Sequence, residues 1–152
     1  MKIIVDADGC PVRKEVVKLA KEFQVPLLLV KNIYHDINED YGEILTVDAN
    51  QDMADHVIVK HTNKGDIVVT QDYGLAALSL GKSAYVIHQD GWFFTNENID
   101  GLLMKRHINQ QMRKKQKKYT KTAKRKQKDN EAFEAKLRQF MMKKLNSDCK
   151  SL

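Results

Sequence analysis

Three things are scarce in this chain of 152 residues: cysteine, long apolar runs and, over one segment, acidic residues. The two cysteines, Cys10 and Cys149, lie near opposite ends of the chain, which argues against a disulfide framework or a cysteine-based zinc site. No apolar run approaches the roughly 20 residues that a membrane-spanning helix needs. The first residues also lack the pattern of a secretory signal. The sequence therefore predicts a cytoplasmic protein that does not associate with membranes.

Acidic residues are missing between positions 105 and 128, where twelve residues are Lys or Arg. The net charge of the chain is +6, so subtracting these twelve charges leaves −6 for the remainder. An acidic body thus carries a basic arm, and we expect the arm to bind nucleic acid rather than to be a solvated helix without a ligand. The predicted nucleic-acid-binding residues are Arg113, Lys114, Lys115, Lys117, Lys118, Lys121, Lys124, Arg125 and Lys126.

Short apolar segments alternate with amphipathic ones through the first 88 residues. Short apolar runs bounded by turn signals are typical of strands covered on both faces, and strands that alternate with helices favour a mostly parallel sheet. We expect a three-layer α/β fold, with about five strands in a central sheet and helices on both faces. The predicted strands are 2–6, 26–32, 43–47, 65–70 and 83–88, and the predicted helices are 11–23, 51–63 and 72–81.

The character of the chain changes after Ile87. Residues 88–98 are typical of a turn followed by a small hairpin or a loop, and helix, basic arm and helix follow. The last helix, 130–145, has an apolar stripe that we expect to pack on the body. We divide the chain into an α/β domain, residues 1–98, and a basic helical C-terminal extension, residues 99–152, that packs on it. The sequence leaves open whether the protein forms a homodimer.

Five aspartates lie at or near the predicted strand ends. Asp6 and Asp8 end the first strand, Asp72 follows the fourth, and Asp52 and Asp55 share a face at the start of a helix. Ligands of open parallel sheets gather at the carboxyl ends of the strands, so we expect these side chains to share one crevice. Crowded carboxylates repel one another, and a hard divalent cation, Mg²⁺ or Mn²⁺, relieves the repulsion.

Each feature of this region also has a purely structural interpretation. Asp8 can end the strand and cap the helix that begins near Pro11, Asp72 can cap the helix that follows it, and Asp52 suits a helix dipole. Cys10 lies at a helix amino terminus, where the pKa of a thiol can fall, but we favour a small buried residue. The coincidence of aspartates at several strand ends favours a metal site over separate structural roles.

The stretches VDADGCPV, QDMADHVI and GDIVVTQDYGLA resemble the YaiI/YqxD family of small bacterial proteins, whose fold resembles the PIN-domain nucleases. The resemblance runs from Lys2 to about Thr95. It implies a PIN-like fold and an acidic metal-binding cluster with a polar residue beside it. The residues that match the cluster are Asp6 with Asp8 from the first stretch, Asp55 with Asp52 as a further candidate from the second, and Asp72 with the neighbouring Thr70 from the third.

The resemblance implies a metal-dependent nuclease, for which RNA is a more probable substrate than DNA. Asp6 and Asp72 would bind one cation directly and Asp55 directly or through water, while Asp8 and Asp52 would complete the shell or hold a second ion. The expected catalytic group is Asp6, Asp8, Asp55 and Asp72. The basic arm would follow the phosphates.

Two other functions remain open. VDADGC also resembles the opening of haloacid-dehalogenase-type phosphatases, in which Asp6 would attack phosphate and Asp8 would protonate the leaving group. That motif normally has a threonine where this chain has Cys10. The other alternative is a non-catalytic RNA- or ribosome-associated binding protein, in which the aspartates are structural.

Overall fold

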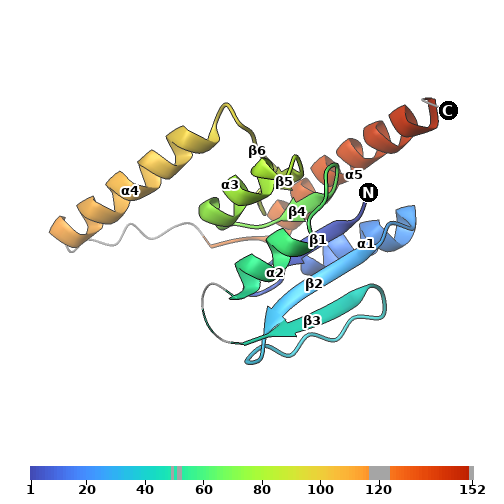
Figure 1. The fold of residues 1–152 in the computed structure, drawn as a ribbon, viewed down its shortest axis with the longest axis horizontal. Coiled ribbons are helices and arrows are strands. Elements are labelled where there is room, and N and C mark those ends of the chain that lie inside the picture. Colours follow the sequence, from blue (N-terminus) through green and yellow to red (C-terminus); the bar gives the residue numbers. More distant parts are fainter. Residues whose placement is uncertain (49, 51–52, 117–123, 151–152) are drawn as a thin grey trace.

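The computed structural model describes residues 1–48, 50, 53–116 and 124–150. Within these residues, six strands form one sheet in the order β3-β2-β1-β4-β5-β6 (Figure 1). The strands are β1 (Ile3–Asp6), β2 (Leu27–Asn32), β3 (Glu43–Val47), β4 (Ile67–Val69), β5 (Tyr85–Ile87) and β6 (Phe93–Phe94). The helices are α1 (Arg13–Phe23), α2 (Met53–His61), α3 (Tyr73–Gly81), α4 (Ile99–Gln116) and α5 (Gln127–Lys150).

The sheet is parallel except at one edge. β1 pairs with β2 on one side and with β4 on the other, and β6 runs antiparallel to β5 with Ile87 opposite Phe93. The mostly parallel α/β fold expected from the sequence is therefore confirmed. The segment after Ile87, which the sequence leaves as a hairpin or a loop, forms a short sixth strand.

Alternate residues of β1 separate two apolar cores. Ile3 and Val5 pack in a cluster with α1 and α5, whereas Ile4 packs in a second cluster with α2, α3 and the start of α4. Helices therefore cover both faces of the sheet (Figure 1). Because side chains alternate along a strand, Asp6 lies on the same face as Ile4, toward α2 and α3.

The two C-terminal helices contact the body differently. Phe133, Leu137 and Met141 of α5 are fully buried in the cluster that contains Ile3. In α4, Leu102 and Leu103 pack on the second cluster, whereas residues 104–114 are exposed, and the helix projects from the body (Figure 1). The division at residue 98 stays a prediction, although α5 completes the core that β1 and α1 begin.

In the ranges that the structure describes, no helix combines the length and the apolar character needed to cross a bilayer.

Replacing Phe133 with alanine tests the contribution of α5 to this core. Phe133→Ala should lower the free energy of unfolding by about 3–5 kcal/mol, because it removes a fully buried ring and leaves a cavity. Met142→Ala, on the exposed side of the same helix, should cost less than about 1 kcal/mol. Urea unfolding of the two variants measures the difference, and equal losses would contradict the packing of α5.

Candidate active site

The carboxyl ends of β1 and β4 lie side by side at the centre of the sheet. From β1 the chain crosses to β2 on one side, whereas β4 pairs on the other side, so the strand order reverses between them. In open α/β sheets this switch point is where ligands bind. Asp6 is the last residue of β1, and Thr70 directly follows β4. The two residues therefore meet at the place where a ligand is expected.

Thr70 joins the two strand ends through its hydroxyl group. Its Oγ1 donates to Oδ2 of Asp6 at 3.1 Å and accepts the backbone N–H of Asp72 at 3.0 Å. Oδ1 of Asp72 in turn accepts the N–H of Leu75 at 3.1 Å and caps α3. Thr70 is buried, so this chain of bonds fixes the positions of both carboxylates. Asp72 thus has the predicted capping role and also lies beside Asp6.

Burial raises the pKa of Asp6 to about 6, and the hydrogen bond from Thr70 opposes this effect. The carboxylates of Asp55, Asp72 and Asp8 raise the pKa further, in that order of influence. Three of the other four predicted aspartates therefore lie near enough to Asp6 to act on it electrostatically. Asp52 lies outside the described residues.

Asp8 is held by the neighbouring strand. Both of its carboxylate oxygens accept the backbone N–H of Asn32, at 3.2 and 3.0 Å, and Nδ1 of His35 lies 2.8 Å from Oδ1. The helix cap expected of Asp8 is wrong, because Val12 occupies the N-cap of α1 without a side-chain bond. Asp8 instead ties the end of β1 to the loop after β2.

A cleft of about 600 Å³ opens between these strand ends and α4. Asp6 and Asp72 lie on its sheet side, together with the side chains that follow β4 and β5. The helix side is rich in cations and amides. The lining residues are Asp6, Gln71, Asp72, Tyr73, His88, Leu102, Lys105, Arg106, Asn109, Gln110 and Arg113.

His88 is a lining residue that sequence reasoning missed. Burial lowers its pKa, its ring stacks on Trp92 with centroids 4.4 Å apart, and its Nδ1 accepts the N–H of Asp90 at 3.1 Å. The imidazole is therefore neutral at neutral pH, with its proton on Nε2. His88 directly follows β5, so the rule about carboxyl ends of strands that selected Asp6 could also have selected His88.

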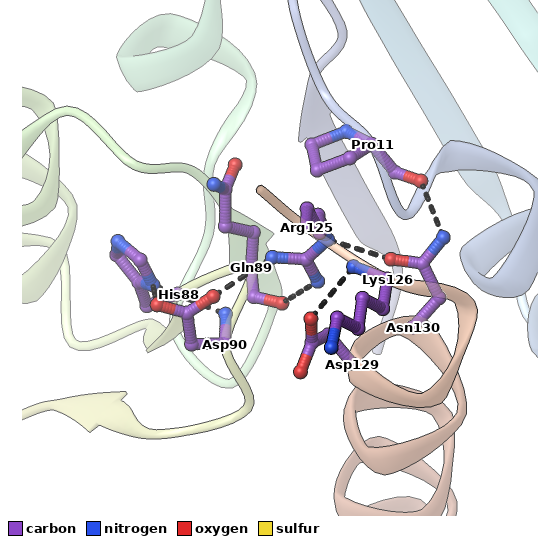
Figure 2. Close-up of polar contacts among 8 residues, drawn as sticks. All are labelled: Pro11, His88, Gln89, Asp90, Arg125, Lys126, Asp129 and Asn130. Atoms are coloured by element: carbon purple, nitrogen blue, oxygen red, sulfur yellow. Dashed lines mark hydrogen bonds and ion pairs between the residues drawn. The ribbon is translucent and has the colours of Figure 1, made fainter. Parts of the chain in front are cut away.

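Arg125 connects the turn after β5 to the start of α5 (Figure 2). Its Nη1 donates to Asp90 Oδ1 at 2.8 Å, its Nη2 to the carbonyl of Gln89 at 2.6 Å, and its Nε to Asn130 Oδ1 at 2.6 Å. Asn130 also donates to the carbonyl of Pro11 at 3.3 Å. Three nitrogens of Arg125 thus have protein partners. A nucleic-acid phosphate would have to compete with these partners for the guanidinium, and the role of Arg125 in binding stays a prediction.

The other residues of the predicted nucleic-acid surface are described in part. Arg113 and Lys114 are exposed on α4, and Lys124 and Lys126 are exposed before α5. Lys117, Lys118, Lys121 and the side chain of Lys115 lie outside what the structure describes. Arg113 lines the cleft. Lys105 and Arg106 line it too; they belong to the basic segment but are not among the residues predicted to bind.

Two described carboxylates could hold a divalent cation only if its other ligands came from outside the described side chains. No three His, Cys, Asp or Glu side chains in the described part of the chain are placed to hold a metal by themselves. Mg²⁺ is commonly bound through one or two carboxylates together with waters and substrate phosphates, and it does not need a full protein cage. Asp6 and Asp72 supply two such carboxylates in one cleft. Burial, and to a smaller extent the neighbouring carboxylates, raise the pKa of Asp6, and a cation would offset both effects.

The thiol of Cys10 does not have the properties of a nucleophile. Burial raises its pKa to about 11, so it stays protonated at neutral pH. The sequence predicts a small buried residue here, and Cys10 is partly buried in the turn after β1.

Helices on both faces of a central, mostly parallel sheet make this a three-layer α/β protein. Its carboxylate cleft lies at the switch point of the sheet. The chain belongs to the YaiI/YqxD family, because the model of the family described as "Uncharacterized BCR, YaiI/YqxD family" matches residues 4–143. A UPF0178 protein of Alkaliphilus oremlandii is 56% identical over 88% of this chain and 86% of its own length. A UPF0178 protein of Natranaerobius thermophilus is 50% identical over 97% of this chain and 100% of its own length. No solved structure matches the chain.

The raised pKa of Asp6 predicts a pH-dependent effect on stability. The carboxyl group holds its proton up to about pH 6 in the folded state but loses it near the ordinary value of 3.8 when unfolded. The stabilising effect of this proton is therefore present below pH 4 and is lost as the pH rises to 6. Without metal, Asp6→Asn should be more stable than the wild type at pH 7.5 by on the order of 2 kcal/mol, with the gain vanishing near pH 4.

Thermal unfolding between pH 4 and 8 in the presence of a chelator measures this effect. Asp100→Asn, an exposed carboxylate at the start of α4, is the matched control and should follow the wild type. A constant difference between Asp6→Asn and the wild type across this range would show that Asp6 has an ordinary pKa.

Removing the guanidinium of Arg125 should destabilise the protein. Arg125→Gln loses a charged contact with Asp90 and the bond to Gln89, at a cost of about 1–3 kcal/mol in the free energy of unfolding. Arg125→Lys should restore little, because an ammonium group cannot reproduce the three directions of the guanidinium. Urea unfolding beside the exposed neighbour variant Lys124→Gln gives the comparison. Equal stability of the two glutamine variants would show that the contacts of Arg125 drawn in Figure 2 contribute nothing.

Proposed function

We propose that this protein is a divalent-metal-dependent hydrolase that cleaves phosphodiester bonds in RNA. The observation that supports the proposal most strongly is the composition of the cleft, in which Asp6 and Asp72 share one space with Lys105 and Arg106. Hydrolysis of a phosphodiester needs carboxylates that can hold a cation and positive groups that bind the phosphate oxygens. The cleft combines both kinds of group at the switch point of the sheet.

Asp6 and Asp72 are the residues that would hold Mg²⁺ or Mn²⁺. Such a cation, when bound, lowers the pKa of a water and offsets the negative charge that develops on the phosphate. Thr70 would keep the carboxylate of Asp6 in one orientation, since its hydroxyl proton is directed at Oδ2. Asp55 would add negative charge that strengthens cation binding, as its effect on the pKa of Asp6 indicates.

Lys105 and Arg106 would place the phosphate against these carboxylates. Both are exposed residues of α4 that line the cleft. The neutral imidazole of His88 would add a hydrogen-bond donor through Nε2 without adding charge. Binding of this kind holds the scissile bond near the carboxylates, and such positioning contributes much of the rate in phosphoryl chemistry.

A non-catalytic RNA-binding protein is the second candidate. The observation that favours it is that the described carboxylates do not form a three-ligand metal group by themselves. The phosphatase hypothesis is less well supported, because it needs Asp8 as an acid. Both oxygens of Asp8 already accept the N–H of Asn32.

Cleavage of end-labelled single-stranded RNA in the presence of Mn²⁺ tests the proposal. Asp72→Asn should lower the rate by about a hundredfold or more, and a chelator should abolish cleavage by the wild type. The asparagine side chain still caps a helix well, so α3 should stay intact. Asp100→Asn, which removes an exposed carboxylate outside the cleft, should cleave at the wild-type rate.

Two results would contradict the hydrolase. Cleavage that survives in Asp72→Asn would place the activity elsewhere or in a contaminant. RNA that is bound but never cut, with or without Mn²⁺, would favour the binding protein.

A further inference from the structure

One face of α4 is directed at the strand ends. The lining residues on this helix recur at helical spacing, at positions 102, 105, 106, 109, 110 and 113. Leu102 packs on the second apolar cluster and anchors the first turns of the helix. The remaining five side chains are exposed and polar, so α4 forms one polar wall of the cleft along about three turns.

The cations on this wall form no ion pair with another described residue. Among the ion pairs between described residues, none involves Lys105, Arg106 or Arg113. Cations elsewhere differ: Lys18, for example, pairs with Glu134 at 2.7 Å. The three groups on α4 thus keep their full charge for an anionic ligand.

The position of one of these cations is set by an aromatic ring. The guanidinium of Arg106 lies over the ring of Tyr73, 5.6 Å from its centre. Tyr73 directly follows Asp72, the residue that caps α3. A cation–π contact of this kind favours the observed orientation. Arg106 therefore contacts the residue next in sequence to Asp72, and both side chains line the cleft.

We propose that this face of α4 binds successive phosphates of a single RNA strand and leads the strand to Asp6 and Asp72. Arg106 and Arg113 are seven residues apart, roughly 10 Å along the helix axis, so they can contact different phosphates. The direction of the strand toward the carboxylates rests on the proposed hydrolase. The binding of phosphates by α4 does not depend on it.

The rest of the lining fits unpaired bases. Tyr73 and His88 contribute rings, and the amides of Gln71, Asn109 and Gln110 can both donate and accept hydrogen bonds. Rings and amides can reach the faces and edges of bases that are unstacked, whereas paired bases in an A-form duplex keep these groups inaccessible. The cleft therefore selects a single strand rather than a duplex.

Binding measured without catalysis tests the inference. The anisotropy of a short fluorescein-labelled single-stranded RNA would be followed in chelator, so that no cleavage occurs. Arg106→Gln and Lys105→Gln should each weaken binding by about tenfold, and each should reduce the slope of log affinity against log salt by about 0.7. Lys64→Gln removes an equal charge from the exposed turn before β4, outside the cleft and outside the predicted nucleic-acid surface, and should weaken binding by less than about threefold.

The outcomes separate this inference from the proposed hydrolase. Selective loss in the two cleft variants supports the inference even if the wild type never cleaves RNA, a result that would overturn the hydrolase alone. Equal losses in Arg106→Gln and Lys64→Gln would overturn the inference and leave a general electrostatic attraction. Equally strong competition by duplex RNA would overturn the selection of a single strand, whether or not the protein cleaves.

Discussion

The pairing of β1 with β4 is the constraint on which the candidate site depends. This pairing sets Ile3 opposite Ile67 and joins parts of the chain that are 64 residues apart in sequence. Only because these strands are neighbours does the hydroxyl of Thr70 reach the carboxylate of Asp6. The same pairing creates the reversal of strand order at which the cleft opens. A shift of the register of β1 by one residue would move Asp6 to the opposite face of the sheet and separate it from Asp72.

The electrostatics of the site follow from that arrangement. The fold buries Asp6 and surrounds it with other carboxylates, which is unfavourable for its charged form. The opposite wall of the cleft supplies cations, without ion-pair partners among the described residues, from a helix that belongs to another part of the chain. Negative and positive groups therefore face one space without forming direct ion pairs among the described residues. Such a space suits a ligand that brings both charges, as a phosphate with its counter-cation does.

Much of this could be predicted from local sequence. Apolar runs that end in Asp6 or just before Thr70 and Asp72 identify parallel strands and their carboxyl ends, and the strand-end rule turns these positions into a site. The role of Asp8 could not be predicted in this way. Its partner is the backbone N–H of Asn32, which becomes available only through the geometry of a neighbouring strand.

The basic segment shows the same limit. Charge counting identifies twelve cations but cannot distinguish Arg106, which lines the cleft, from Arg125, whose guanidinium is taken up by Gln89, Asp90 and Asn130. That distinction depends on which face of α4 is turned to the body and on where α5 begins. Both are decided by packing between distant segments, about which a local charge pattern contains no information.

The burial of Phe133 against α1 has a consequence for the synthesis of the protein. Ribosomes produce α5 more than a hundred residues after α1, yet α5 supplies three fully buried side chains of the core that α1 begins. Until then the nascent chain has an uncovered apolar face, although β1, β2 and β4 can already pair. Such surfaces attract chaperones and other nascent chains. The rate of translation through the basic segment would therefore determine how long this face stays open to them.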